Sequence, residues 1–298
     1  MSGGIYTTDK SLDTILSLGD VETNNLQDNE VLLYNTTTEK WENGTVGAGG
    51  ATEILETNNL VAKLGTAGAN LNSGATENIL LGLNAGNALT HGDKNVCISS
   101  NTGDKITGGF NNVYIGENCG RSTNTIIQNS IAIGNDACNS GSCGNGSTSI
   151  GYYAGQSNTG IGSVNIGNQA GRYCVNSNDG QYSINIGHVS GRSNPKEHCI
   201  NMGSGAGYSG TSIQAINIGR ASGGSVAGSS SINLGAFANQ VNGTTHNQAI
   251  VINATGANVP SVGNDTFVVK PVRGVAHGLG VGVMKYDPAT SELTYSTT

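Results

Sequence analysis

The apolar residues in the middle of the chain follow one repeated motif. Two apolar residues flank one variable residue, and in most copies a glycine follows, as in Ile184-Asn185-Ile186-Gly187. Eleven copies occur, and their closing residues are 16 to 20 positions apart: 82, 99, 116, 134, 151, 167, 187, 203, 219, 235 and 253. Because side chains alternate along a strand, the motif predicts a short strand with both apolar side chains on one face, followed by a corner at the glycine.

A second pair of small residues follows the corner in the later copies, at Ala170-Gly171, Ser190-Gly191, Ala206-Gly207 and Ser222-Gly223. This pair predicts either another corner or a second short strand, so each unit is expected to be a coil. A single coil cannot bury its own isoleucines, whereas parallel stacking about 4.8 Å apart lets neighbouring coils support each other. The sequence therefore predicts an all-β fold, a parallel β-solenoid or β-roll of about eleven coils of 16–20 residues.

The variable middle residue is asparagine in five successive copies, namely Asn165, Asn185, Asn201, Asn217 and Asn233. These side chains should point away from the isoleucines and stack in a ladder of hydrogen-bonded amides. The ladder could be a ligand-binding or interchain face, or it could only satisfy its own amides and solubilise one face. The pattern leaves open whether the isoleucine face lies inside each coil or at the axis of an oligomer.

Composition narrows the function classes. Glycine accounts for 47 of 298 residues, proline for 4, charged residues for 11% and aromatic residues for 5%. Disordered chains are usually rich in charge or proline, and collagen needs a strict glycine triplet, so a thin-cored repeat protein fits better. A net charge of −7 with scattered cations argues against nucleic-acid binding. We expect no membrane insertion and no secretory signal, because neither a long apolar run nor a basic-then-apolar N-terminus occurs.

Catalytic, metal and cofactor sites are not predicted. The six cysteines lack metal-ligand spacing and are expected to be small buried thiols, although Cys138 and Cys143 could bridge within one loop. Glu117 and Asp136 are the nearest approach to a carboxylate pair, and both are expected to be solvated turn residues, so we predict no enzyme. Six tyrosines could stack on sugars or cover corners: Tyr114, Tyr152, Tyr153, Tyr173, Tyr182 and Tyr208.

The ends of the chain differ from the repeat. Residues 1–50 are predicted to form an N-terminal β module with a glycine-rich linker, for attachment or oligomerisation. Residues 51–77 are predicted to be a neck, in which Ile54, Val61 and Leu64 favour a short helix. Residues 78–257 form the repeat body, and residues 258–298 a C-terminal element. Residues 33–41 and 284–295 each have the strand–turn–strand pattern of a small β-hairpin.

The Ile-Asn-Ile-Gly-x-x-Ala-Gly units resemble the head repeats of trimeric adhesins, the YadA-like heads, and the repeat fibre proteins of large DNA viruses and phages. The resemblance covers about residues 78–257. Residues 18–41 also resemble short β modules of phage tail fibres, and residues 267–295 resemble the C-terminal element of giant-virus fibre-like proteins.

The resemblance implies a homotrimer on the virion surface that attaches to the host, with other virion proteins and host-surface glycans as partners. It also implies a C-terminal element that caps the roll and registers three chains. A trimeric cell-surface adhesin and a polysaccharide-degrading tailspike are the alternatives.

Overall fold

The computed structural model describes residues 21–22, 31–35, 39–44, 60–64, 67–72, 75–121, 126–140, 144–174, 180–193, 196–210, 212–224, 228–239, 246–271, 283–287, 290 and 292–296. Over these residues the chain is all-β, a parallel β-solenoid of about 10 turns, and no helix is found. The chain divides into two compact units, Met1–Asn129 and Ser130–Thr298.

The first unit contains seven strands: β1 (Val21–Glu22), β2 (Val31–Asn35), β3 (Lys40–Gly44), β4 (Leu60–Leu64), β5 (Ile79–Leu83), β6 (Val96–Ile98) and β7 (Val113–Ile115). Strand β3 pairs in parallel with β1 and antiparallel with β2. Strands β4 to β7 pair in parallel, each with its successor. Their register joins residues at the same position of successive motif copies, as in Cys97 opposite Tyr114.

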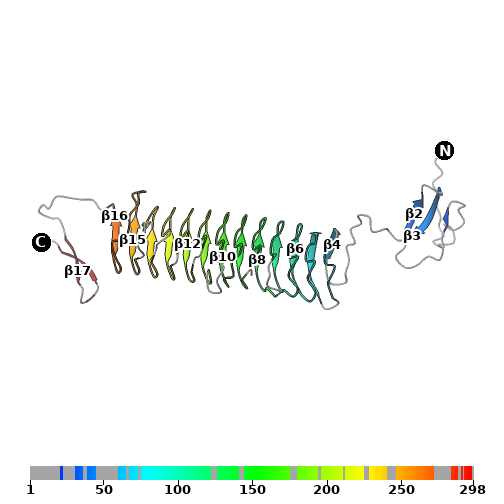
Figure 1. Ribbon diagram of the computed structural model, residues 1–298, viewed down its shortest axis with the longest axis horizontal. Helices are drawn as coiled ribbons and strands as arrows, with labels where there is room; N and C mark the ends of the chain where they lie inside the picture. Colours follow the sequence, from blue (N-terminus) through cyan, green and yellow to red (C-terminus); the bar gives the residue numbers. More distant parts are fainter. Residues whose placement is uncertain are drawn as a thin grey trace. The chain divides into compact units, whose positions relative to one another are not determined.

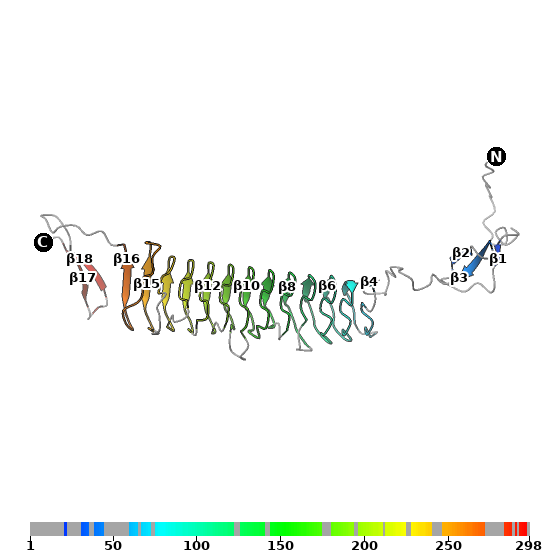
Figure 2. The same ribbon diagram turned by 45° about the horizontal axis from the view of Figure 1, so that its top comes forward.

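The second unit continues with β8 (Ile131–Ile133), β9 (Thr148–Ile150), β10 (Val164–Ile166), β11 (Ile184–Ile186), β12 (Ile200–Met202), β13 (Ile216–Ile218), β14 (Ile232–Leu234), β15 (Ile250–Asn253), β16 (Phe267–Lys270), β17 (Val283–Asp287) and β18 (Glu292–Ser296). Strands β8 to β16 form a parallel ladder in sequence order, and the two views of Figures 1 and 2 show them stacked side by side. Strand β17 pairs antiparallel with β18.

The predicted strand positions are confirmed. All eleven motif copies lie in strands β5 to β15, one strand to a coil. The second small pair is a turn and not a strand, as at Ala170-Gly171. The predicted helix in the neck is wrong at Leu60–Leu64, because these residues form β4 and pair with β5. At the other end Phe267–Lys270 adds one more parallel strand to the ladder.

The apolar residues that flank the middle of each strand lie outside the coils. The interior of the second unit holds mainly small and polar side chains, whereas that of the first unit also holds large apolar side chains such as Leu80 and Tyr114. Three positions of each coil from β5 to β14 are buried: the residue before the strand, the middle residue of the strand, and the third residue after the corner. In the coil of β11 these are Ser183, Asn185 and Ser190, each 0% exposed. The flanking residues Ile184 and Ile186 are half-buried. Since the middle residue of the strand points into the coil, its two neighbours point outward.

Two glycines of most coils are favoured by backbone geometry, although Ser99 and Cys138 occupy equivalent corners elsewhere. Gly187, the corner residue, has φ +125°, and a Cβ there would lie 2.8 Å from the backbone carbon of Gly203. Gly191, in the second corner, has φ +56°, and a Cβ there would lie 1.8 Å from Oδ1 of Asn185. A side chain is disfavoured at both sites by the positive φ and by the close approach of the next coil or of the asparagine amide.

Candidate binding surfaces

The five asparagines predicted to stack do so inside the coils of the second unit. Nδ2 of each donates to Oδ1 of its predecessor, over 2.9 Å from Asn185 to Asn165 and 2.8 Å in the next three steps. All five side chains are at most 1% exposed. The ladder begins on Ser149, whose Oγ accepts from Asn165 at 3.3 Å. Buried amides are thus paired in a row that water does not reach.

The interior position of the ladder differs from the surface roles predicted for it. Residues 0–1% exposed offer no side-chain surface to a ligand, to another chain or to solvent. The ladder ends at Asn233, because Val251 occupies the next position of the register and cannot donate. Oδ1 of Asn233 consequently has no hydrogen-bond partner among the described residues. We therefore assign the ladder an internal role, the pairing of neighbouring coils.

A corresponding ladder in the first unit was not predicted from the sequence. Asn78, Asn95 and Asn112 occupy the position just before the strand and are buried. Nδ2 of Asn95 donates to Oδ1 of Asn78 at 3.1 Å, and Nδ2 of Asn112 donates to Oδ1 of Asn95 at 2.9 Å. In the first unit the buried asparagines precede the strands and the middle residues of the strands are apolar. In the coils of β10 to β14 the buried asparagine is instead the middle residue of the strand. The 17-residue spacing of these asparagines was the signal that could have revealed them.

The first and third residues of each strand form two apolar columns on the outside of the second unit. We call them the outer columns. Every member in β8 to β15 is half-buried or exposed, and only Thr148 is polar. They consist of Ile131, Thr148, Val164, Ile184, Ile200, Ile216, Ile232 and Ile250, and of Ile133, Ile150, Ile166, Ile186, Met202, Ile218, Leu234 and Ile252. Monomeric proteins rarely expose a continuous apolar surface of this kind.

The tyrosines considered as sugar-stacking residues fall into two groups. Tyr114 is 1% exposed and occupies the interior of the β7 coil, so its predicted role at the surface is wrong. Tyr152, Tyr173, Tyr182 and Tyr208 are exposed and Tyr153 is half-buried. Burial raises the pKa of the Tyr114 hydroxyl well above its usual value, and the neighbouring Cys97 and Cys119 raise it further.

Arginine and tyrosine alternate along the corners of four neighbouring coils in the second unit. The Arg172 guanidinium carbon lies 4.2 Å from the ring centre of Tyr153 and 4.3 Å from that of Tyr173. The Arg192 guanidinium carbon lies 5.6 Å from the ring centre of Tyr173 and 6.0 Å from that of Tyr208. We call these five residues the arginine–tyrosine row. The hydrogen bond with Tyr152 is the main cause that raises the pKa of Tyr153.

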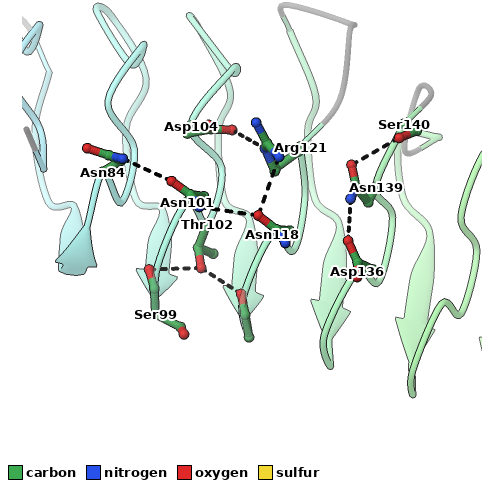
Figure 3. Close-up of polar contacts among 11 residues, drawn as sticks. Asn84, Ser99, Asn101, Thr102, Asp104, Asn118, Arg121, Asp136, Asn139 and Ser140 are labelled. Atoms are coloured by element: carbon green, nitrogen blue, oxygen red, sulfur yellow. Dashed lines mark hydrogen bonds and ion pairs between the residues drawn. The ribbon is translucent and has the colours of Figure 1, made fainter.

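At the corresponding corner of the first unit, the arginine is paired with a carboxylate. Arg121 takes the same position in its coil as Arg172, five residues after the corner, and its Nε lies 2.9 Å from Oδ1 of Asp104 (Figure 3). Beside this ion pair, Asn84 donates to Asn101 at 2.9 Å and Asn101 to Asn118 at 3.3 Å, which forms a short external amide ladder. The polar groups of this corner are therefore occupied by each other.

The acidic residues beside the corners of the coils interact with neighbouring side chains. Asp104 is paired with Arg121, and Asp136 accepts a hydrogen bond from Nδ2 of Asn139 (Figure 3). No group of three or more histidine, cysteine and acidic side chains that could hold a metal occurs among the residues described. These acids stabilise turns.

Four of the cysteines are buried thiols, as predicted: Cys97, Cys119, Cys174 and Cys199. Cys138 is disulfide-bonded, and Cys143 lies outside the described residues. Burial raises the pKa of the Cys97 thiol from 9.0 to about 12 and also raises that of Cys199. Since only the thiolate is a good nucleophile, these cysteines are expected to be inert in the folded protein.

Alkylation with iodoacetamide at pH 8 should therefore leave Cys97 unmodified in the folded protein and modify it in denaturant, as read by peptide mass spectrometry. An unfolded Cys97 loses its proton near pH 9, whereas the folded residue keeps it until about pH 12. Between these values the unfolded state binds fewer protons, so the free energy of unfolding should fall as the pH rises. Equal modification of Cys97 in native and denatured samples would contradict its burial.

Comparison with known proteins supplies no relative: no family model, curated protein or solved structure matches the chain. Within the described part of the chain, no helix is long and apolar enough to cross a membrane.

Proposed function

We propose that the chain is the structural fibre protein of a virus or phage particle, a homotrimer that mediates attachment to a host surface. The observation that carries the proposal is the pair of outer columns, which presents two mostly apolar side chains from every coil of β8 to β15. The residues of this face recur about every 4.8 Å, once per coil. An identical chain has the same spacing, so two copies in the same register can pair their apolar residues at every coil.

Burial of this face would stabilise the assembly considerably. Full burial of an isoleucine contributes about 1.5–3 kcal/mol, so covering the part still exposed contributes roughly 1 kcal/mol per residue. The gain recurs along the columns and exceeds the cost of association after several coils. Three chains around one axis form a closed assembly, in which no chain keeps its apolar face in water.

The proposed role is binding and not catalysis. A stiff rod that repeats the same surface in three copies multiplies weak contacts, which suits attachment to a dense array of receptors. The position on a virion, with other virion proteins as partners, rests on the resemblance of the repeats and of both ends to virus and phage fibres. The small paired strands at the two ends, β2 with β3 and β17 with β18, would then serve as flanking modules that attach and register the chains.

Light scattering on the purified chain tests this proposal. The expected mass is that of three chains of 30.2 kDa. A chain that ends at residue 271 keeps the whole ladder through β16 and lacks β17 and β18, and it should form trimers more weakly or in mixed register. A stable monomer at high concentration would overturn the trimeric fibre.

A further inference from the structure

The arginine–tyrosine row carries an unneutralised positive charge in an acidic protein. The chain has a net charge of −7, yet none of Arg172, Arg192 and Arg220 forms an ion pair with a carboxylate in the described part of the molecule. At the β8 end of the row, Asp136 acts electrostatically on Tyr153, and its carboxylate already accepts a bond from Asn139. The charge of the row is thus available to a ligand.

The guanidinium groups are held in place by groups that do not cancel their charge. Nε of Arg172 donates to Oε1 of Gln156 at 2.6 Å, and Nη1 donates to Oε1 of Gln169 at 3.2 Å. An arginine has five N–H donors, so three remain on Arg172. Nε of Arg192 is buried and has no acceptor among the described residues. The tyrosine rings lie within 4.2–6.0 Å of the guanidinium carbons and orient the groups. The donors of Arg172 that Gln156 and Gln169 do not use remain for an anion.

We propose that the arginine–tyrosine row binds an extended anionic polysaccharide, one that bears carboxylate or sulfate groups. Acidic groups of the sugar chain would accept hydrogen bonds from Arg172 and Arg192, which belong to successive coils about 4.8 Å apart. Sugar rings would pack on the exposed faces of Tyr152 and Tyr208. In a later coil, Arg220 lies 4.3 Å from the ring centre of Phe237 and adds a further positive charge to the second unit. This inference names the ligand class and rests on the proposed attachment function.

A nucleic acid fits the row less well than a polysaccharide. Binding of a phosphate backbone needs many clustered cations, because each phosphate contact adds to the affinity. Here each positive charge is separated from the next by an aromatic ring, and the whole chain is acidic. An acidic sugar chain, with fewer charges and large apolar ring faces, matches alternating arginine and tyrosine.

The test compares Arg172→Gln/Arg192→Gln with Arg121→Gln in the full chain. Glutamine already occupies the equivalent position at Gln156, so the coil accepts it. Arg121 shares that position but is paired with Asp104, so the control removes a charge without touching the row. Polygalacturonate and dextran sulfate serve as anionic probes, methyl-esterified polygalacturonate as the uncharged counterpart and oligothymidylate as the nucleic acid. Affinities are measured by titration calorimetry at low salt, with circular dichroism to verify folding.

The wild-type chain should bind at least one anionic polysaccharide, and the double variant should bind it at least about tenfold more weakly. The Arg121→Gln chain should match the wild type within about twofold, because Arg121 lies outside the row. No binding of either anionic polysaccharide, equal loss in both variants, equal binding of the methyl ester or tighter binding of oligothymidylate would overturn the inference. A trimer that binds no anionic polysaccharide leaves the fibre proposal standing, whereas a monomer contradicts the fibre proposal whatever it binds.

Discussion

Aspartate in place of Ile218 is expected to separate the trimer into single chains. Ile218 is the third residue of β13 and 39% exposed in the single chain. In the proposed trimer its three copies lie in the apolar interface, where an unpaired carboxylate costs several kcal/mol. The dissociation constant should rise at least about a thousandfold, equivalent to ~4 kcal/mol. Light scattering over a range of protein concentrations measures this change.

Ile213 provides the matched control. It precedes β13 in the same coil and is 37% exposed, yet it lies outside the outer columns. The Ile213→Asp chain should remain trimeric and keep its circular dichroism spectrum, because an exposed charge away from the interface costs little. If both variants stay trimeric, or if both dissociate, the strand face is not the interface between chains.

The inside and outside of the coil could not be assigned from the sequence, although the strands could. Alternation along a strand places the isoleucines and the middle residues on opposite faces. It does not say which of the two faces points into the coil. A preference for buried isoleucine would have given the wrong answer for the single chain. The deciding quantity is the interior volume, which depends on where the turns close, and the turns here depend on many residues with positive φ, such as Val189 and Phe237.

Polar side chains are tolerated inside the coil because the register of the ladder satisfies them. An isolated buried amide would cost about 1–3 kcal/mol, but a neighbour at the same position of the next coil pairs with it. The residue type at the middle of the strand therefore differs between coils together with the other buried residues of those coils. Tyr114 is buried at that position in β7, beside Asn112, whereas Asn185 is buried beside Ser183 in β11.

The arginine–tyrosine row was only partly visible in the sequence. Arg172 and Arg192 both stand five residues after a corner glycine, which an alignment of the motif copies reveals. That Tyr153 and Tyr173 contact the same guanidinium group is not visible, because Tyr153 is two residues after its corner and Tyr173 is six. The contact joins residues at different positions of neighbouring coils, so the spacing of the motif does not predict it.

Removal of one amide from the interior ladder is expected to destabilise the second unit strongly. Asn201 donates to Oδ1 of Asn185 and accepts from Nδ2 of Asn217, both over 2.8 Å. Asn201→Ala leaves two buried polar atoms without a partner, Oδ1 of Asn185 and Nδ2 of Asn217. Each unpaired atom costs about 1–3 kcal/mol, so the total loss should be about 2–6 kcal/mol. Ser204→Ala, in the same coil but exposed, should change the free energy of unfolding by less than about 0.5 kcal/mol. Denaturant unfolding followed by circular dichroism compares the two.

The end of the ladder gives the opposite test of the same argument. Val251→Thr keeps the shape of the side chain and adds a hydroxyl that can donate to the unpaired Oδ1 of Asn233. The free energy of unfolding should therefore stay the same or rise by about 1 kcal/mol, although a hydroxyl in an apolar site ordinarily destabilises. An Asn201→Ala loss no larger than that of Ser204→Ala, together with a destabilising Val251→Thr, would mean that the amides do not hold the coils together. A large loss in Asn201→Ala together with no loss in Val251→Thr would support a ladder closed to water, in which each coil is stabilised by its neighbours.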